Sequence, residues 1–447
     1  MAVRHEVENL IRRGNIFYWR PRIPAAFIHC RPGGWRRSGP GSGSPNSGGL
    51  PTEATVAHVL VSKYADHLPL YRQAQIMSRQ GIDLDRSTLA DWVGRAAYEL
   101  RPVFNALIAD LKRSTKLFMD ETGAPVLDPG SRKTKTGYFW ALARDDHPWG
   151  GGAPPGVAFT YAPGRGGVHA ERILRGFSGI LQVDGYAGYN RLIAPERVGP
   201  NIRLAYCWAH ARRKLVEITR NGSAPIAEDG VKRIGELYRI EAELRGRGPE
   251  ARLAGRQERS EPLVADMQAW LIHHRARAAT KSPLGEALAY IAKYWDGLKL
   301  FLTDGRIEID NNSVERTIRP IALNRKNALF AGHDAGAENW ATIASLIETC
   351  KRNAIDPQAY LTATLTAIVN AHKQSRVDEL LPWNHQHSRP KSARPELLSK
   401  KSGNHNRDNC RSKTVNPVCP TSPAISLLGM LFQNACNQAI IQDPTEP

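Results

Sequence analysis

The order of apolar and polar positions changes character at two points along the chain. The first fifty residues are rich in Arg, Gly, Pro and Ser and show no sustained helix or strand period, so we expect them to be largely unstructured. From position 51 the pattern is periodic, beginning with an amphipathic stretch over 53–64. After about His385 the chain is rich in Ser, Asn, Lys and Pro and aperiodic, which predicts a disordered tail over 385–447.

Two short helices are predicted after the first amphipathic stretch. Apolar residues recur at helical spacing over 70–77 and over 89–96, and Gly81 separates the two runs. Asp85 or Ser87 is placed to cap the second helix. In a DNA-binding protein this pattern is typical of a helix-turn-helix motif, with Arg86, Ser87 and Thr88 at the start of the reading helix. An ordinary helical hairpin packed on the next domain has the same pattern, and both interpretations stay open.

A β-rich block follows the helical pair. Strands are predicted at 116–119, 137–143, 157–161, 179–183 and 202–206, and turn-rich segments between the first three favour an antiparallel meander. A helical stretch at 169–175 precedes the fourth strand, and a basic helix at 209–219 follows the fifth. Three meander strands followed by alternating helix and strand is the order of a ribonuclease H-like α/β core.

The remaining periodic residues predict helices. The pattern over 226–302 is almost wholly helical and indicates an all-α insertion, and amphipathic helices are expected at 340–350 and 358–369. The expected division of the chain is as follows: an atypical N-terminus 1–50, a helical DNA-binding segment 51–100, a first core part 101–225, the insertion 226–303, a second core part with the third carboxylate 304–350, a helical segment 351–384 and the tail.

Charge and cysteine usage narrow the class of protein. The formal net charge of +18 attracts polyanions, so double-stranded DNA is the leading partner. No apolar stretch is long enough for a membrane helix and no apolar signal segment is visible, so we expect a cytoplasmic, nucleoid-associated protein without a membrane partner. The six cysteines form no CxxC pair and are interpreted as reduced thiols: Cys30, Cys207, Cys350, Cys410, Cys419 and Cys436.

Three carboxylates carry the candidate chemistry. Asp120 and Asp184 each follow an apolar strand, where a carboxylate is costly unless it is paired or bound to a cation. Two such residues on neighbouring strands suit magnesium or manganese. Glu315 lies in the first turns of a helix that Asp310 or Asn311 is placed to cap. Two such ions, about 3.5–4 Å apart, activate a water or a 3′-hydroxyl and stabilise the leaving oxygen of a phosphoryl transfer, as in DNA nicking and joining.

Basic side chains near these carboxylates are candidates for phosphate contacts. The first group follows Glu315 and the second lies on the basic helix after the fifth strand. Cys207 and His210 accompany the second group; they supply only two of the four ligands of a structural zinc, so a contact with phosphate near the active site and a packing role both stay open. The two basic groups are Arg316, Arg319, Arg325 and Lys326, and Arg212, Arg213 and Lys214.

Several longer motifs are shared with one known family. They are residues 61–72, Asp120-Glu121-Thr122, Val183-Asp184-Gly185-Tyr186, the Cys-x-x-His element Cys207-Trp208-Ala209-His210, and residues 310–320 and 346–351. On these motifs, the sequence from about position 50 to 383 closely resembles the transposases of insertion sequence family sixty-six. This resemblance implies a ribonuclease H-like fold, a DDE triad at Asp120, Asp184 and Glu315, and a helical insertion between the second and third acids. It also implies transposon ends and target DNA as partners, a homo-oligomer on DNA and accessory proteins of the same element.

The two ends depart from that family. Members usually carry a coiled coil and a cysteine-paired zinc module before the matching region, where this chain has residues 1–49 with Cys30 alone. Members also end soon after the segment that corresponds to 380–383, whereas this chain continues. The sequences of both ends resemble what is produced when DNA is translated out of the ancestral reading frame. The expected activity is metal-dependent strand cleavage and strand transfer; a decayed copy that only binds DNA, or a metal-dependent nuclease, are the alternatives.

Overall fold

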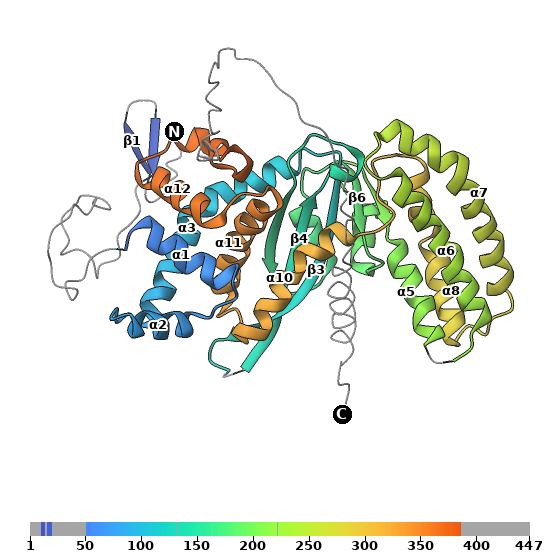
Figure 1. The fold of residues 1–447 in the computed structure, drawn as a ribbon, viewed down its shortest axis with the longest axis horizontal. Helices are drawn as coiled ribbons and strands as arrows, with labels where there is room; N and C mark the ends of the chain where they lie inside the picture. The colour runs from blue at the N-terminus through green and yellow to red at the C-terminus, as the bar shows by residue number, and fades with distance from the viewer. Residues whose placement is uncertain (1–9, 14–15, 20–50, 132, 221, 386–447) are drawn as a thin grey trace, which may run out of the picture. The chain divides into compact units, whose positions relative to one another are not determined.

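The structure is a computed structural model that describes residues 10–13, 16–19, 51–131, 133–220 and 222–385 (Figure 1). These all lie in the first of the two units into which the chain divides, Met1–Ser388. The expected tail and most of the expected unstructured N-terminus lie outside the described residues. Strands β1 (Leu10–Arg13) and β2 (Ile16–Trp19) pair antiparallel. The sequence pattern did not predict these two short strands, although the β-branched and aromatic run at 16–19 favours extended backbone.

A five-stranded mixed sheet positions the candidate site, with the strand order β5-β4-β3-β6-β7. The first three strands form the predicted antiparallel meander, and β6 and β7 run parallel to β3. Helix α4 (Gly167–Ile173) precedes β6, as expected. The α/β class is therefore confirmed. The strands are β3 (Lys116–Asp128), β4 (Lys133–Arg144), β5 (Gly156–Ala162), β6 (Gly179–Val183) and β7 (Ile202–Tyr206).

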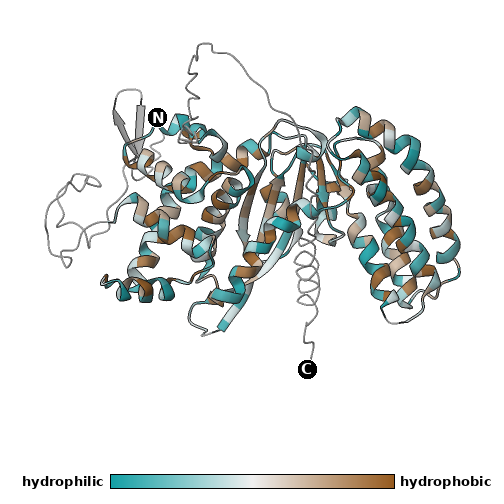
Figure 2. Ribbon diagram, in the orientation of Figure 1, coloured by the Kyte–Doolittle hydropathy of each residue, from teal (hydrophilic) through white to brown (hydrophobic). Residues whose placement is uncertain are grey.

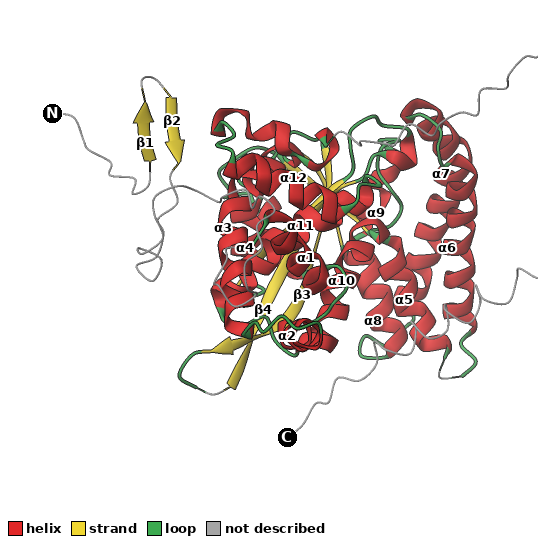
Figure 3. Cartoon of the chain, turned by 60° about the vertical axis from the view of Figure 1, so that its left-hand side comes forward, coloured by secondary structure: helices red, strands yellow, loops and turns green. Residues whose placement is uncertain are grey.

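Strand β3 corrects one prediction. The expected strand ended at Met119, whereas β3 continues to Asp128 and pairs with β4 along that length. The second half of β3 contains Gly123 and Pro125, and both residue types are poor strand formers. The local sequence pattern therefore does not predict that the strand continues beyond Met119. Backbone hydrogen bonds to residues 331–332 add to the pairing there. Asp120 therefore lies inside a strand, and the outer ends of β3 and β4 extend beyond the neighbouring helices (Figure 3).

Helices from both ends of the described chain pack with the sheet in one hydrophobic core. Helix α3 begins after Asp85, whose carboxylate accepts a hydrogen bond from the Ser87 backbone at 2.8 Å, so of the two expected caps Asp85 is the one that forms. It continues for 26 residues, so the predicted helix at 89–96 is only its first part. Figure 2 shows apolar residues on the strands and on the helices around them. These helices are α1 (Glu53–Tyr64), α2 (Leu70–Arg79), α3 (Arg86–Leu111), α11 (Asp334–Arg352) and α12 (Pro357–Val369).

A second hydrophobic cluster joins the helices expected over 226–302 to α5, the helix that follows β7. Trp208, Trp270 and Trp295 are buried in it. Two buried arginines of α7, Arg252 and Arg256, contact Glu241 of α6. These helices are α5 (Trp208–Thr219), α6 (Pro225–Leu244), α7 (Pro249–Arg275), α8 (Pro283–Lys293) and α9 (Trp295–Lys299).

Helix α10 (Asn312–Ala328) returns the chain to the sheet and packs on β3 and β4 (Figure 1). Within the described ranges, every helix is too short or too polar to cross a membrane. Short 3-10 helices complete the structure: η2 (His147–Trp149), η3 (Ala187–Ile193), η4 (Leu300–Leu302), η5 (Gln374–Leu380) and η6 (Pro382–Asn384).

Candidate active site

Asp120 and Asp184 lie level with each other on adjacent parallel strands. The last paired residues of β3 and β6 are Phe118 and Gln182, and each aspartate follows its paired residue by two positions. Because side chains alternate between the faces of a strand, residues two apart share a face. Asp184 directly follows β6, as predicted. The register therefore places both carboxylates beside each other, just past the last paired residues of β3 and β6 and on the same face of the sheet.

The acidic groups repel one another. Burial raises the pKa of Asp120 well above its ordinary value, and the charges of Asp184, Glu121 and Glu315 raise it further. The Glu121 backbone donates to Asp120 Oδ1 at 2.8 Å, and the Tyr186 backbone donates to Asp184 Oδ1 at 2.9 Å. Across the described ranges, neither aspartate has a basic side chain in an ion pair. Such a site attracts a cation.

Glu315 enters from the first turn of α10, where the helix dipole favours a negative charge. Asn311 is the N-cap residue but makes no side-chain cap bond, while Asp310 Oδ1 accepts from the Asn312 backbone at 3.0 Å. The segment before α10 is tied to β6 by Gln182, a buried residue that the sequence analysis did not single out. Its amide donates to the Glu308 carbonyl at 2.8 Å and accepts from the Glu308 backbone at 2.9 Å.

Cys207 and His210 lie beside Glu315. Cys207 is the residue before α5 and His210 lies in the first turn of that helix. His210 Nε2 is 3.8 Å from Glu315 Oε1. The Cys207 Sγ accepts a hydrogen bond from the Asn311 backbone at 3.3 Å, which links the start of α5 to the start of α10. Burial lowers the pKa of His210, although the nearby Glu315 charge acts in the opposite direction.

The donor set of the three acids suits hard divalent cations. Carboxylate oxygens are the preferred ligands of magnesium, which binds them at about 2.0–2.1 Å. Among the described residues, one group of three possible metal ligands has its ligand atoms within 4.8 Å of one another, and it consists of Cys207, His210 and Glu315. The three acids together do not form such a group. Ligands shared between two ions spaced about 3.5–4 Å apart do not need such close contact. The donor set therefore suits hard divalent cations, and the expectation of two ions stays a prediction.

Glu121 is a further buried acid next to this site, on the opposite face of β3 from Asp120. Its carboxylate accepts from the Tyr189 hydroxyl at 2.6 Å and pairs with Arg165 at 2.8 Å. The Arg165 guanidinium lies 4.0 Å from the centre of the Tyr186 ring. These contacts connect β3 with the loop that carries Asp184. The signal was present in the motif at 120–122, of which only the first acid was chosen.

Two tyrosines of the helical region cover the loop after Asp184. The Tyr294 hydroxyl donates to the Gly185 carbonyl at 2.5 Å, and the Tyr290 ring fills the space where a Cβ of residue 185 would lie. A larger residue at Gly185 would have to displace this ring. Sequence reasoning missed both tyrosines, because nothing in the local pattern of α8 and the residue after it indicates which side chain contacts a distant loop.

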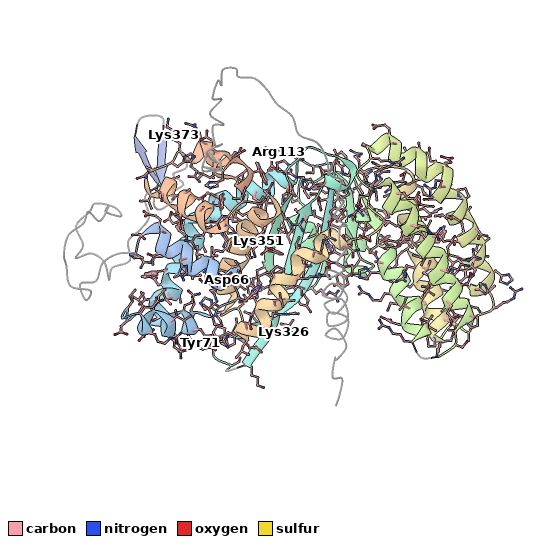
Figure 4. The ribbon with its side chains drawn as sticks, in the orientation of Figure 1. Asp66, Tyr71, Arg113, Lys326, Lys351 and Lys373 are labelled. Carbon is pink, nitrogen blue, oxygen red and sulfur yellow. The ribbon has the colours of Figure 1, made fainter. Side chains whose placement is uncertain are left out.

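The predicted basic residues differ in accessibility. On α10, Arg316, Arg319 and Lys326 are exposed, and Lys326 lies in the last turn (Figure 4). Arg325 is half-buried and donates to the Gly123 carbonyl of β3, so it binds its own chain. On α5, all three predicted residues are exposed: Arg212, Arg213 and Lys214. At the start of α3, Arg86 and Ser87 are exposed and Thr88 is half-buried.

The fold and site define an α/β protein with acidic residues gathered where the parallel pairing of two central strands of a mixed sheet ends. Comparison with known families identifies it further. The family described as "Transposase IS66 family" matches residues 48–339, and the "IS66 C-terminal element" matches residues 345–383. The chain belongs to the IS66 transposase family.

Relatives in Sinorhizobium fredii extend the comparison. The chain is similar to the uncharacterized protein y4qI, with 45% identity over 339 residues, which is 75% of this chain and 63% of the relative. It is also similar to the uncharacterized protein y4jD, with 44% identity over 341 residues, which is 75% of this chain and 66% of the relative. The chain thus spans slightly less than two thirds of the length of these relatives.

Proposed function

We propose that this chain is a DDE transposase that cleaves DNA strands and joins them to a target, with Asp120, Asp184 and Glu315 as metal ligands. The observation that carries the proposal is the register of β3 and β6, which brings the two aspartates level just past the point where the pairing of these strands ends. The order β5-β4-β3-β6-β7, with three antiparallel strands and two parallel ones, supports a ribonuclease H-like core.

Asp120 and Asp184 would hold magnesium or manganese from the sheet, and Glu315 would complete the ligand set from α10. Bound ions would supply Lewis-acid activation of the attacking oxygen and neutralise charge at the scissile phosphate. The chain's own part is positioning: Gln182 fixes the segment before α10, and Tyr294 fixes the loop after Asp184. Backbone N–H groups orient both aspartates.

Double-stranded DNA, both transposon ends and target, is the proposed substrate. The net charge of +18 favours binding to phosphates. The exposed basic residues of α5 and α10 lie on the two helices that carry His210 and Glu315, so DNA bound there would lie near the acids. The start of α3 is proposed to contact DNA as the second helix of a helix-turn-helix motif. A homo-oligomer on DNA and accessory proteins of the same element complete the proposed partners.

A strand-transfer assay tests the proposal. The full chain is incubated with magnesium, labelled DNA from the two borders of its own element and a supercoiled target plasmid. Joined products that Asp184→Asn fails to form are expected. Cutting without joining would instead identify a nuclease, and binding without cutting would identify a DNA-binding remnant. Either of these two outcomes rejects the proposed function.

A further inference from the structure

The strongest unexplained feature is the group formed by Cys207, His210 and Glu315. One possible metal-ligating atom from each residue lies within 4.8 Å of the others. Cys207 and His210 are three positions apart at the start of α5, so both face the same side of that helix. Glu315 reaches the group from the first turn of α10. The group therefore depends on the junction of two helices that are distant in sequence.

Polar atoms in this group lack partners. His210 Nδ1 and Glu315 Oε1 are shielded from solvent, and neither has a hydrogen-bond partner in the described part of the chain. Asn311 borders the group, since its backbone N–H donates to Cys207 Sγ; its side chain is fully buried, and its Oδ1 also has no partner among the described residues. Buried polar atoms are nearly always paired in folded proteins. Unpaired atoms around a thiol, an imidazole and a carboxylate therefore point to a missing cation.

We infer that Cys207, His210 and Glu315 form a binding site for a thiophilic divalent cation, with zinc as the first choice. Zinc takes sulfur, imidazole nitrogen and carboxylate oxygen together, and three protein ligands with one open position are a known zinc arrangement. Magnesium prefers a shell of oxygen atoms only and does not suit this set. On binding, the Cys207 thiol releases its proton to solvent and the sulfur bonds to zinc, with no change of oxidation state.

Glu315 connects this site to the proposed magnesium site. Its oxygen lies 3.8 Å from the His210 ring nitrogen, while its charge also acts on Asp120. One carboxylate cannot serve a soft site and a hard site equally well. A zinc ion held by Cys207 and His210 therefore draws Glu315 away from Asp120 and Asp184. Zinc bound at this site should therefore inhibit magnesium-dependent cleavage. This inhibition rests on the proposed function, whereas the binding of zinc does not.

Cobalt(II) in place of zinc provides a direct test with the full chain. We expect one equivalent of cobalt to produce a near-ultraviolet thiolate charge-transfer band that added zinc removes. Cys207→Ser should abolish this band. Cys350→Ser is the matched control, because Cys350 is also a buried free cysteine but lies on α11, and it should retain the band. The remaining cysteines are present in both variants and cancel in the comparison.

Two further variants cover the case in which Cys207→Ser does not fold. His210→Ala and Glu315→Gln should each weaken cobalt binding by about tenfold or more, as loss of a ligand costs at least as much as loss of an outer-shell partner. A folded wild-type chain without the thiolate band, or an undiminished band in Cys207→Ser, would overturn the inference. Asp120→Asn should keep the band, because Asp120 is not a ligand of this site. A wild-type chain that shows the band but cleaves no DNA with magnesium would reject the proposed function and retain this site.

Discussion

Asp120 and Asp184 stand level across two parallel strands, each two positions beyond the paired residues Phe118 and Gln182. Neighbouring strands lie about 4.8 Å apart, so two carboxylates in this arrangement are close enough to share a cation or to repel each other without one. Burial is the largest cause of the raised pKa of Asp120, and the charge of the neighbouring Asp184 raises it further.

The first prediction concerns catalysis. Asp120→Asn or Asp184→Asn removes a charged ligand at nearly constant shape, and strand cleavage should fall by roughly a thousandfold or more. DNA affinity in a filter-binding assay should stay nearly unchanged. Asp128→Asn, at the far end of the same strand β3, is the matched control and should cleave like the wild type. Full cleavage by either active-site variant would remove that residue from the metal-binding set.

The second prediction concerns pH in the absence of metal. The folded-state pKa of Asp120 is raised above its ordinary value of 3.8, so the folded chain binds this proton more tightly than the unfolded chain. The resulting stability is present below that ordinary value and is lost as pH rises towards the folded pKa. Asp120→Asn carries no such proton. Its unfolding free energy in urea with a chelator should therefore exceed that of the wild type at pH 8, on the order of 1 kcal/mol or more.

The difference in unfolding free energy between Asp120→Asn and the wild type should shrink as pH is lowered towards 4. The wild-type carboxyl then carries its proton in both the folded and the unfolded chain. A variant less stable than the wild type at pH 8 would show that Asp120 is stabilised by a contact stronger than the repulsion from Asp184 and Glu315.

The third prediction concerns DNA contacts on α10. Changing both Arg316 and Arg319 to alanine should weaken binding to all DNA sequences and lower the salt slope of affinity by roughly 1–2. Arg325→Ala is the contrasting control, because Arg325 donates to the Gly123 carbonyl. It should lower the melting temperature and leave the salt slope unchanged. An unaltered slope in the double variant would show that Arg316 and Arg319 do not touch phosphates.

The fourth prediction concerns the buried charges that hold α7. Arg256 is fully buried, pairs with both Glu241 oxygens at 2.7 Å and donates to the carbonyls of Phe301, Asp304 and Ile307. Arg256→Met leaves Glu241 buried with fewer partners and should cost about 3–5 kcal/mol. Urea unfolding measures this cost.

Arg259→Met on the same helix is the matched control. Arg259 pairs with Glu243 at 2.6 Å, but their side chains are 41% and 50% exposed. Loss of this exposed pair should change the free energy of unfolding far less than Arg256→Met does, because solvent screens it. Equal costs for the two variants would mean that the buried network adds no more than a surface ion pair.

Local pattern was sufficient for much of the fold. The strands at 179–183 and 202–206 were predicted with the bounds that the structure has, because each is a short apolar run bounded by polar and turn residues. The position of Asp184 directly after β6 follows from the predicted end of that strand at Val183. The cap at Asp85 was also predictable, since an N-cap depends only on residues two or three positions away.

The rest depended on partners that are distant in the sequence. The outer half of β3 forms because β4 and residues 331–332 pair with it, although its own residues disfavour a strand. Arg325 bonds to β3 instead of facing solvent because α10 packs there. The contact of His210 with Glu315, and that of Tyr294 with Gly185, require helices to meet across the chain. Periodicity records which face of an element is apolar. Which distant element covers that face is decided only when the tertiary structure buries it.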